Sequence, residues 1–316
     1  MHGELDLIRR IAAQAGVRDG VRVGIGDDAA VLDDGTVLAL DMVVDGVHVS
    51  RSTHSPADIG HTALAVNLSD IAAMGARPVA AVVGLGVPDD LDPDDVARMY
   101  ASMDATAAAH SMSVVGGDVS ASPVLTLSVA IVGRMPDGVP PVLRSGGRAG
   151  DLLVVSGPLG ASAAGLRLLR GGSRDPDTVA RDALVAAHLR PVPLVAQGLN
   201  LAESGATAML DISDGLLLDA DRLARASGLR ADIDLGRVPR APGVDMVARR
   251  AGVAPDLFAA TGGDDYQLLA AMPPSAGLAS YLTVVGRLAE GTPGVRALRG
   301  GVDVTPHRLG WEHGGT

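Results

Sequence analysis

The stretch SPADIGHTALAVNLSDIAAMGARP, residues 55–78, carries the clearest structural signals in the chain. Ser55 is a good N-cap residue, Pro56 suits the first helical position, and Gly75 marks a stop, so a helix is predicted between them. The strand-like run VAAVVGLGVP follows at 79–88. A helix that leads directly into an apolar strand favours an α/β fold.

Further helices and strands alternate on both sides of this stretch. The length of 316 residues exceeds that of a usual single core and suggests two domains. The Gly- and Arg-rich linker RSGGRAG at 144–150 predicts domains 1–146 and 147–316, each α/β and with a mixed sheet. Strands are expected at 36–49, 124–133, 151–157, 207–210, 230–235, 281–286 and 294–304, and helices at 94–110 and 161–171.

The tripeptide Gly-Gly-Asp occurs at 116–118 and again at 262–264. Each copy is interpreted as a turn that enters a strand. The repetition suggests a duplication of the two halves, although a match of three residues is weak support.

Composition excludes several classes of chemistry. The chain has no Cys, which excludes disulfides, thiolate nucleophiles and iron–sulfur clusters. All 26 basic residues are Arg, so the Lys of a Walker P-loop, of a protein kinase or of a Schiff base is absent. The formal charge of −11 argues against nucleic-acid binding, which needs a basic face.

Nothing in the sequence indicates a membrane or a secretory protein. No apolar run approaches the roughly 18 residues that a membrane span requires. The beginning, MHGELDLIRR, lacks a basic stretch followed by an apolar block. The expected location is the cytoplasm.

Acidic residues gather at turns and inside strands, where folding alone does not favour them. The run VGIGDDAAVLDDG at 23–35 packs four Asp and three Gly into thirteen positions. If such residues converge, divalent cations are needed to offset their repulsion, and oxygen-only ligands favour Mg²⁺. Mg²⁺ beside a Gly-rich backbone is typical of nucleotide-phosphate sites. The candidate ligands are Asp27, Asp28, Asp41, Asp70, Asp118, Asp211 and Asp214.

A structural explanation competes with the functional one at most of these positions. The pair at 27–28 suits a hairpin turn, Asp70 suits the solvated side of a helix, and Asp118 suits the start of a strand. Asp211 and Asp214 could cap the helix that follows them, with help from Ser213. The ligand interpretation is favoured at Asp41, because an unpaired charge in a buried strand costs several kcal/mol.

Three other residues are weaker candidates from the sequence alone. His48 follows a strand and could recognise phosphate, although a structural or solvated role is more common. Arg144 begins the linker and could clamp a phosphate or be solvated. Trp311 could stack on a ring ligand, but a role as a packing anchor is favoured.

Several segments together, in order and spacing, resemble the thiamine-monophosphate kinase family of the aminoimidazole ribonucleotide synthetase-like superfamily. The resemblance extends from Gly3 to His313, and NLSDIAAMGA combined with DISDGL is its most specific part. The segments are GELDLI, GIGDDAAVL, LDMVVDGVH, ALAVNLSDIAAMGARP, VVGGD, RSGGRAGD, LDISDGL, GGDDYQLL and GWEH.

This resemblance implies a two-domain fold of that superfamily and ATP-dependent phosphorylation of thiamine monophosphate to the diphosphate. The attacking substrate phosphate is already ionised, so an in-line transfer assisted by several Mg²⁺ ions needs no general base. A homodimer joined through the N-terminal sheets is also implied. The implied metal ligands are Asp28, Asp41, Asp70, Asp118, Asp211 and Asp214; the ATP-binding residues are Gly117, Asp118, Arg144, Ser213 and Tyr100; and the substrate-binding residues are His48, Asp264 and Trp311.

The sequence departs from the family pattern at two places. Asp264 stands where the family has Glu in GGEDYEL, and Gln267 replaces the second Glu, so a substrate contact at 264 would use a side chain that is one methylene shorter. Ala39 and Leu40 precede Asp41 where the family has hydroxyl residues, so a metal contact there would use the backbone carbonyl oxygen of Leu40.

Two other functions compete with the kinase. One is an aminoimidazole ribonucleotide synthetase-type, ATP-dependent ligase from the same superfamily. The other is a non-catalytic, Asp-rich cation-binding protein, although no loop with the regular ligand spacing of an EF-hand is present.

Overall fold

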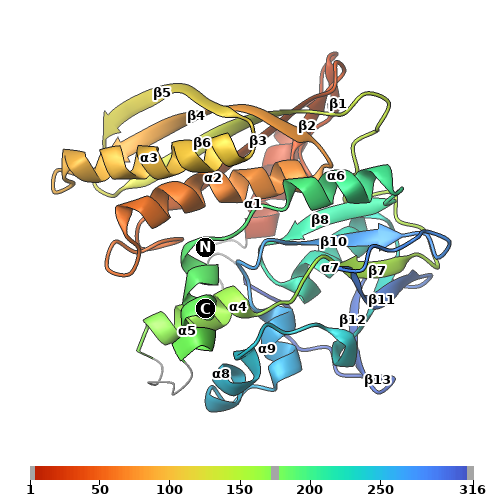
Figure 1. Cartoon of the computed structure of the whole chain (residues 1–316). Helices are drawn as coiled ribbons and strands as arrows, with labels where there is room; N and C mark the ends of the chain where they lie inside the picture. The colour runs from red at the N-terminus through yellow and green to blue at the C-terminus, as the bar shows by residue number, and fades with distance from the viewer. Residues whose placement is uncertain (1–3, 172–177, 312–316) are drawn as a thin grey trace.

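Two mixed sheets form the frame of the molecule (Figure 1). The computed structural model describes residues 4–171 and 178–311. Each sheet combines antiparallel with parallel pairing, which confirms the predicted α/β class with mixed sheets. The first sheet has the order β1 (Val21–Val23), β2 (Ala30–Leu32), β3 (Thr36–Val44), β6 (Thr126–Arg134), β4 (Arg77–Val87), β5 (Ser113–Ala121). The second has the order β13 (Val302–Asp303), β12 (Gly294–Arg299), β9 (Arg230–Asp234), β11 (Thr283–Ala289), β7 (Leu152–Val155), β10 (Gln267–Met272), β8 (Ala208–Ile212).

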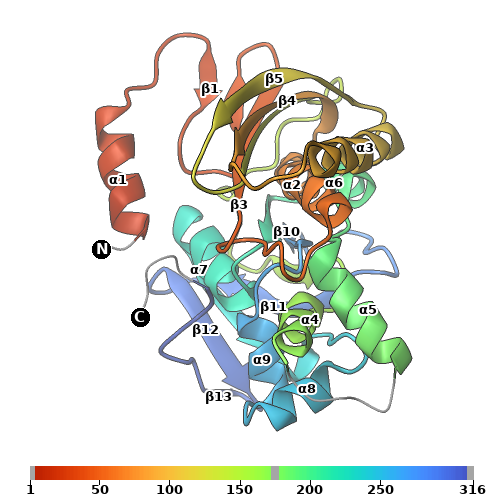
Figure 2. The same cartoon turned by 90° about the vertical axis from the view of Figure 1, so that its left-hand side faces the viewer.

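Helices lie between the sheets and around the second sheet (Figures 1 and 2). The change from the first sheet to the second falls between Arg134 and Leu152, the interval that contains the predicted join at 146/147. In the described residues, no helix combines the length and the apolar character needed to cross a membrane. The helices are α1 (Glu4–Gln14), α2 (Pro56–Ala73), α3 (Pro93–Ala109), α4 (Ala161–Leu169), α5 (Thr178–Leu189), α6 (Val195–Glu203), α7 (Leu216–Ala226), α8 (Val244–Arg250) and α9 (Pro255–Thr261), with the 3₁₀ turn η1 (Leu235–Arg237).

Helix α2 begins and ends as its sequence predicts. Ser55 is its N-cap and forms a reciprocal capping box with Asp58, and Pro56 is the first helical residue. Gly75 follows the C-cap with a φ of 68°, a conformation that favours glycine. Thirteen of its 18 residues are buried, because α2 packs against α3, α6, β3, β6 and β8. The helix therefore lies between the two halves of the chain, where polar residues on it can meet both.

The larger hydrophobic core crosses the boundary between the halves. Leu64 and Ile71 of α2 belong to the same buried cluster as Met209 of β8 and Leu268 of β10. Continuous packing of this kind fixes the second sheet against α2.

One face of the first sheet is left open, while α2 and α3 cover the other (Figures 1 and 2). Along β3, buried Val37 and Ala39 alternate with exposed Leu38 and Leu40, which are 38% and 59% exposed. Val82 of β4 is likewise 44% exposed. Apolar side chains therefore occupy both faces of this sheet.

The two Gly-Gly-Asp segments do not have the same structure. Residues 262–264 lie in the loop before β10, as predicted for a turn that precedes a strand. Residues 116–118 lie inside β5, which pairs with β4 from Ser113 to Ala121, so the turn predicted there is wrong. An added Cβ at Gly117 would lie 2.0 Å from the carbonyl oxygen of Val83, so close strand packing requires a glycine there.

Candidate metal and phosphate site

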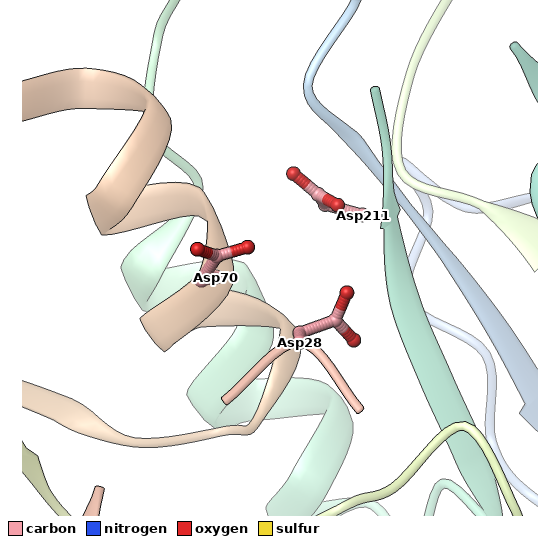
Figure 3. A group of neighbouring side chains, drawn as sticks. All are labelled: Asp28, Asp70 and Asp211. Atoms are coloured by element: carbon pink, nitrogen blue, oxygen red, sulfur yellow. The ribbon is translucent and has the colours of Figure 1, made fainter. Parts of the chain in front are cut away.

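Three carboxylates that are far apart in the sequence meet between the two halves of the chain. Asp28, Asp70 and Asp211 each offer one oxygen, and these oxygens lie within 4.8 Å of one another (Figure 3). Asp28 comes from the connection between β1 and β2, Asp70 from α2, and Asp211 from β8. We call these three residues the Asp cluster. The convergence expected from the sequence is therefore present for these three candidates.

The local structure explains how each carboxylate is presented. Asp28 lies in a hairpin connection between antiparallel strands, so the predicted turn and the predicted site coincide. Asp70 lies near the end of α2, not on a solvated face. Asp211 lies in a strand whose five residues are all buried, and its Oδ2 accepts a hydrogen bond of 2.6 Å from the Ser69 hydroxyl.

Burial and repulsion act together on these carboxyl groups. Burial raises the pKa of Asp70 well above its ordinary value, and the charges of Asp41, Asp211 and Asp28 raise it further. Burial and the charge of Asp28 likewise raise the pKa of Asp211, against the lowering effect of the Ser69 hydrogen bond. The pKa of Asp27 rises to about 6, first through burial and then through Asp28. At neutral pH the cluster therefore favours a bound cation.

Arg144 is the cation that lies closest to the cluster. Its Nη2 lies 2.6 Å from Asp28 Oδ1, and its backbone N–H donates to both carboxylate oxygens of Asp27 at 3.1 Å. Burial alone would lower the pKa of Arg144, but the charges of Asp28 and Asp27 raise it, so the guanidinium stays charged. Arg144, the residue predicted to bind phosphate, thus connects the linker at 144–150 to the hairpin between β1 and β2.

The residues present fit a hard divalent cation. Asp28 has a fully buried side chain, yet its Oδ2 has no hydrogen-bond partner. A buried carboxylate oxygen without a partner is costly, and a metal ion supplies what it lacks. The cluster offers only oxygen ligands, which suit Mg²⁺ better than zinc.

Asp41 and Asp214 lie close enough to the cluster to share its electrostatics. Burial raises the pKa of Asp41, and the charges of Asp28 and Asp214 add to the effect. The Asp41 backbone N–H donates to Asn67 Oδ1 at 3.0 Å, which links β3 to α2. Asp214 forms an ion pair of 2.6 Å with Arg222 of α7.

The helix-cap explanation for Asp211 and Asp214 is not supported. Gly215 is the N-cap of α7 and makes no side-chain capping bond. Asp219, in the first turn of the helix, instead accepts the backbone N–H groups of Asp214 and Gly215 at 3.0 and 3.1 Å. It also accepts a hydrogen bond of 2.7 Å from Arg222. The side chains of Asp211 and Asp214 instead contact Ser69 and Arg222, and neither caps the helix.

Other predicted residues lie apart from the cluster. Asp118 and Gly117 are on the exposed edge strand β5, and two strands, β6 and β4, separate it from β3 and its Asp41. Tyr100, on α3, packs against the larger core. The Leu40 backbone, whose carbonyl oxygen is the predicted ligand, lies in β3 opposite Ala130 of β6, and its side chain points to the open face of the sheet. Among the described residues, no hydrogen bond or ion pair that the structure gives joins these four residues to the cluster.

Two of the three candidate substrate residues, Asp264 and Trp311, are tied to the loop that carries Asp214, and the third, His48, lies at the end of β3. The Asp264 backbone N–H donates to the Ser213 carbonyl oxygen at 2.7 Å. The Trp311 backbone N–H donates to the Asp214 carbonyl oxygen at 2.9 Å, and Arg308 lies 5.7 Å from the Trp311 ring centre. His48 Nδ1 accepts a hydrogen bond of 3.2 Å from the Val44 backbone N–H, at the end of the strand that carries Asp41.

Several residues that support the site were missed from the sequence. Four residues contact candidate site residues, although the sequence around each of them is ordinary for a helix or a loop: Ser69, Asp219, Arg222 and Tyr266. The spacing of Asn67 and Asp70 on one helix face was the available signal for the link between α2 and β3.

The chain matches two family models in tandem. Residues 26–135 match "AIR synthase related protein, N-terminal domain", and residues 148–274 match "AIR synthase related protein, C-terminal domain". The first match includes Asp28 and Asp70, and the second includes Asp211.

The chain is also similar to characterised proteins over nearly its whole length. It is 36% identical to the thiamine-monophosphate kinase of Mycobacterium tuberculosis over 318 residues, which covers 98% of this chain and 91% of the relative. It is similar to the structure of AaThiL complexed with AMPPCP and TMP, with a TM-score of 0.86, 35% identity and coverage of 98% and 97% of the two chains. The crystal structure of thiamine monophosphate kinase from Aquifex aeolicus matches with a TM-score of 0.83, 32% identity and coverage of 97% and 98%.

Proposed function

Because the chain belongs to the thiamine-monophosphate kinase family of AIR synthase-related proteins, we infer that it phosphorylates thiamine monophosphate to thiamine diphosphate with ATP. The observation that carries this inference in the chain itself is the Asp cluster with its unpartnered Asp28 oxygen. AaThiL, which shares the fold at 35% identity, is complexed with AMPPCP and TMP. The names of these relatives favour the kinase over the ligase and the cation-binding protein considered from the sequence.

The Asp cluster would hold Mg²⁺. Asp41, Asp214, Asp118 and the Leu40 carbonyl oxygen are proposed as further ligands, on the strength of the family resemblance. When bound, Mg²⁺ supplies charge neutralisation to the phosphates of ATP. Among the described residues, this region holds more Asp than Arg side chains, and the excess of negative charge supports binding of more than one ion. The Asp residues are Asp27, Asp28, Asp41, Asp70, Asp211 and Asp214, and the cations paired with them are Arg144 and Arg222.

The chain's own residues would act by binding and orientation. The acceptor is a phosphate oxygen that is ionised at neutral pH, so no side chain needs to remove a proton. Arg144 would hold the nucleotide phosphates from the linker side, with Gly117, Ser213 and Tyr100 as further nucleotide contacts. His48, Asp264 and Trp311 would hold thiamine monophosphate. Attachment of Asp264 and Trp311 to the 213–214 loop supports alignment of this substrate with the Asp cluster.

A phosphate-product assay tests the function. Purified protein with ATP, thiamine monophosphate and Mg²⁺ should form equal amounts of ADP and thiamine diphosphate. Chromatography or ³¹P NMR measures the two products. Omission of thiamine monophosphate or addition of excess EDTA should abolish ADP formation. Binding of Mg²⁺ without any turnover would instead favour a cation-binding protein.

The N-terminal sheets are proposed to pair across a homodimer. Leu38, Leu40 and Met42 of β3 and Val82 of β4 place exposed apolar side chains on the uncovered face. A monomer rarely leaves such a face in water, and a second copy would bury it. In this proposal residues 1–146 provide the dimer contact and most of the nucleotide and metal site, and residues 147–316 complete that site.

The cytoplasmic location remains a prediction.

Replacing Val82 by Arg is expected to produce a monomer. A charge in the middle of a buried apolar interface is costly, so the dimer dissociation constant should rise by at least about 100-fold. Sedimentation velocity of the full chain measures this change. Val179→Arg is the matched control, because Val179 lies on α5 and is 78% exposed. If Val82→Arg is still a dimer at micromolar concentration, the uncovered face of the first sheet is not the dimer interface.

A further inference from the structure

Tyr266 contacts the Asp264 carboxylate and is close enough to Asp41 and Asp211 to be affected by their charges. Its hydroxyl donates a hydrogen bond of 3.3 Å to Asp264 Oδ1. Burial raises the pKa of Tyr266 well above its ordinary value, and the charges of Asp264, Asp41 and Asp211 raise it further. The hydroxyl therefore keeps its proton and faces carboxylates from both halves of the chain.

The backbone on either side of Asp265 has an unusual conformation. Asp264 has a φ of 62° and Tyr266 a φ of 49°, both in the left-handed region. For residues other than glycine this conformation costs about 1 kcal/mol or more each. Two hydrogen bonds to the neighbouring loop maintain it, from Asp264 N–H to Ser213 O at 2.7 Å and from Tyr266 N–H to Ile212 O at 2.9 Å. Strain that is held in this way is typical of functional sites.

Asp265 fixes the same segment from the other side. Its carboxylate accepts the backbone N–H of Gly160 at 2.6 Å and that of Ser162 at 3.3 Å, at the beginning of α4. The Tyr266 side chain packs against the larger hydrophobic core. The segment is thus anchored on both sides, and the Tyr266 hydroxyl is a fixed donor for Asp264.

We propose that Tyr266 is a positioning residue for the acceptor substrate, because its hydroxyl orients the Asp264 carboxylate toward thiamine monophosphate. This inference rests on the proposed function and on the substrate role given there to Asp264. Asp264 is one methylene shorter than the Glu of the family pattern, so its carboxylate cannot reach as far by its own flexibility. A donor that fixes the direction of the shorter side chain raises the fraction of protein that is ready to bind.

Replacing Tyr266 by Phe removes the hydroxyl and keeps the ring. The KM for thiamine monophosphate should rise about 10- to 20-fold, the lower end of what the loss of one hydrogen bond to a charged group produces, because this bond is long at 3.3 Å. The KM for ATP and kcat should change less than about twofold. Calorimetric binding of thiamine monophosphate in the presence of a non-hydrolysable ATP analogue and Mg²⁺ should weaken by the same factor. Tyr281→Phe is the matched control, since its hydroxyl bonds Asn200 at 3.1 Å and no cluster residue.

The double variant separates positioning from a general structural effect. If the Tyr266 hydroxyl acts through Asp264, then Tyr266→Phe should add less than about twofold to the loss caused by Asp264→Ala, which removes the acceptor oxygens. Equal substrate affinity in wild type and Tyr266→Phe, or full additivity with Asp264→Ala, would overturn the inference; the proposed function would still stand if the wild type is active. A wild type that neither binds nor phosphorylates thiamine monophosphate would overturn the proposed function first, and this inference with it.

Discussion

Replacing Asp70 by Asn is expected to lower kcat/KM for ATP by roughly 10²- to 10³-fold, the usual effect of removing one charge-stabilising group from a phosphoryl-transfer site. The substitution removes a charge with almost no change of volume. Asp70 supplies one of the three oxygens of the Asp cluster, and it is the cluster member that comes from the central helix α2. Steady-state kinetics at saturating thiamine monophosphate measure the change, with Mg²⁺ varied to detect weaker binding of the ion.

The same substitution should increase the stability of the protein in EDTA. Burial and the charges of Asp41, Asp211 and Asp28 raise the pKa of Asp70, so its ionised form destabilises the folded state when no cation is bound. A carboxyl group whose pKa is raised in the folded state lowers the stability of the protein as the pH rises from the ordinary pKa of the group to the raised one. The metal-free wild type should therefore melt at a lower temperature at pH 8 than at pH 5, and Asp70→Asn should reduce this difference.

Magnesium provides the second readout for Asp70. Addition of Mg²⁺ should raise the melting temperature of the wild type and raise that of Asp70→Asn much less, because a bound ion stabilises only the folded state. Asp104→Asn is the matched control, since Asp104 is also on a helix but is exposed. Normal turnover together with a normal Mg²⁺ shift in Asp70→Asn would contradict the ligand role.

The sequence was most informative where a local rule and a tertiary role agree. The ends of α2 followed from Ser55, Pro56 and Gly75, because capping is a local property. Asp41 was singled out because an apolar strand rarely contains a charge without a partner, and it lies close enough to Asp28 to share its electrostatics, while its role as a ligand remains a prediction. The Asp cluster itself followed from the number of carboxylates at unusual places, not from any single one.

The support for the site could not be predicted in the same way. Ser69 reaches Asp211 across 142 positions of sequence, and such a contact depends on how α2 packs against β8. Asp219 and Arg222 have the ordinary spacing of a helical ion pair, which gives no indication that they hold the loop before α7. Apolar residues on both faces of β3 predicted a buried strand, and only the arrangement of the helices reveals that one face is open.

The strand β5 illustrates a different limit. Two consecutive glycines at 116–117 suggested a turn, yet the pair is accommodated in a strand because neighbouring β4 approaches too closely for a side chain at Gly117. A glycine that serves close packing has the same appearance in the sequence as one that serves a turn. The family resemblance implies a nucleotide contact at Gly117, so under the proposed function two requirements would act on one residue.

Replacing Arg144 by Gln should impair both nucleotide use and folding. Its guanidinium is the cation nearest to the cluster, and removal of an Arg that stabilises phosphoryl transfer costs on the order of 10³-fold in kcat. The substitution also leaves the fully buried side chain of Asp28 without its ion-pair partner at 2.6 Å. Loss of one partner of a buried pair costs about 3 kcal/mol, so the melting temperature in EDTA should fall.

The two effects of Arg144 can be separated by the choice of variant and by magnesium. Arg144→Lys keeps the charge but not the planar fork, so it should recover most of the stability and only part of the activity. Mg²⁺ should restore part of the melting temperature of Arg144→Gln, since a cation at Asp28 replaces the missing charge. Arg148→Gln is the control, because Arg148 lies in the same linker and is exposed. If Arg144→Gln bound ATP normally and melted at the wild-type temperature, Asp28 would need a different counter-charge and the linker would lie outside the phosphate site.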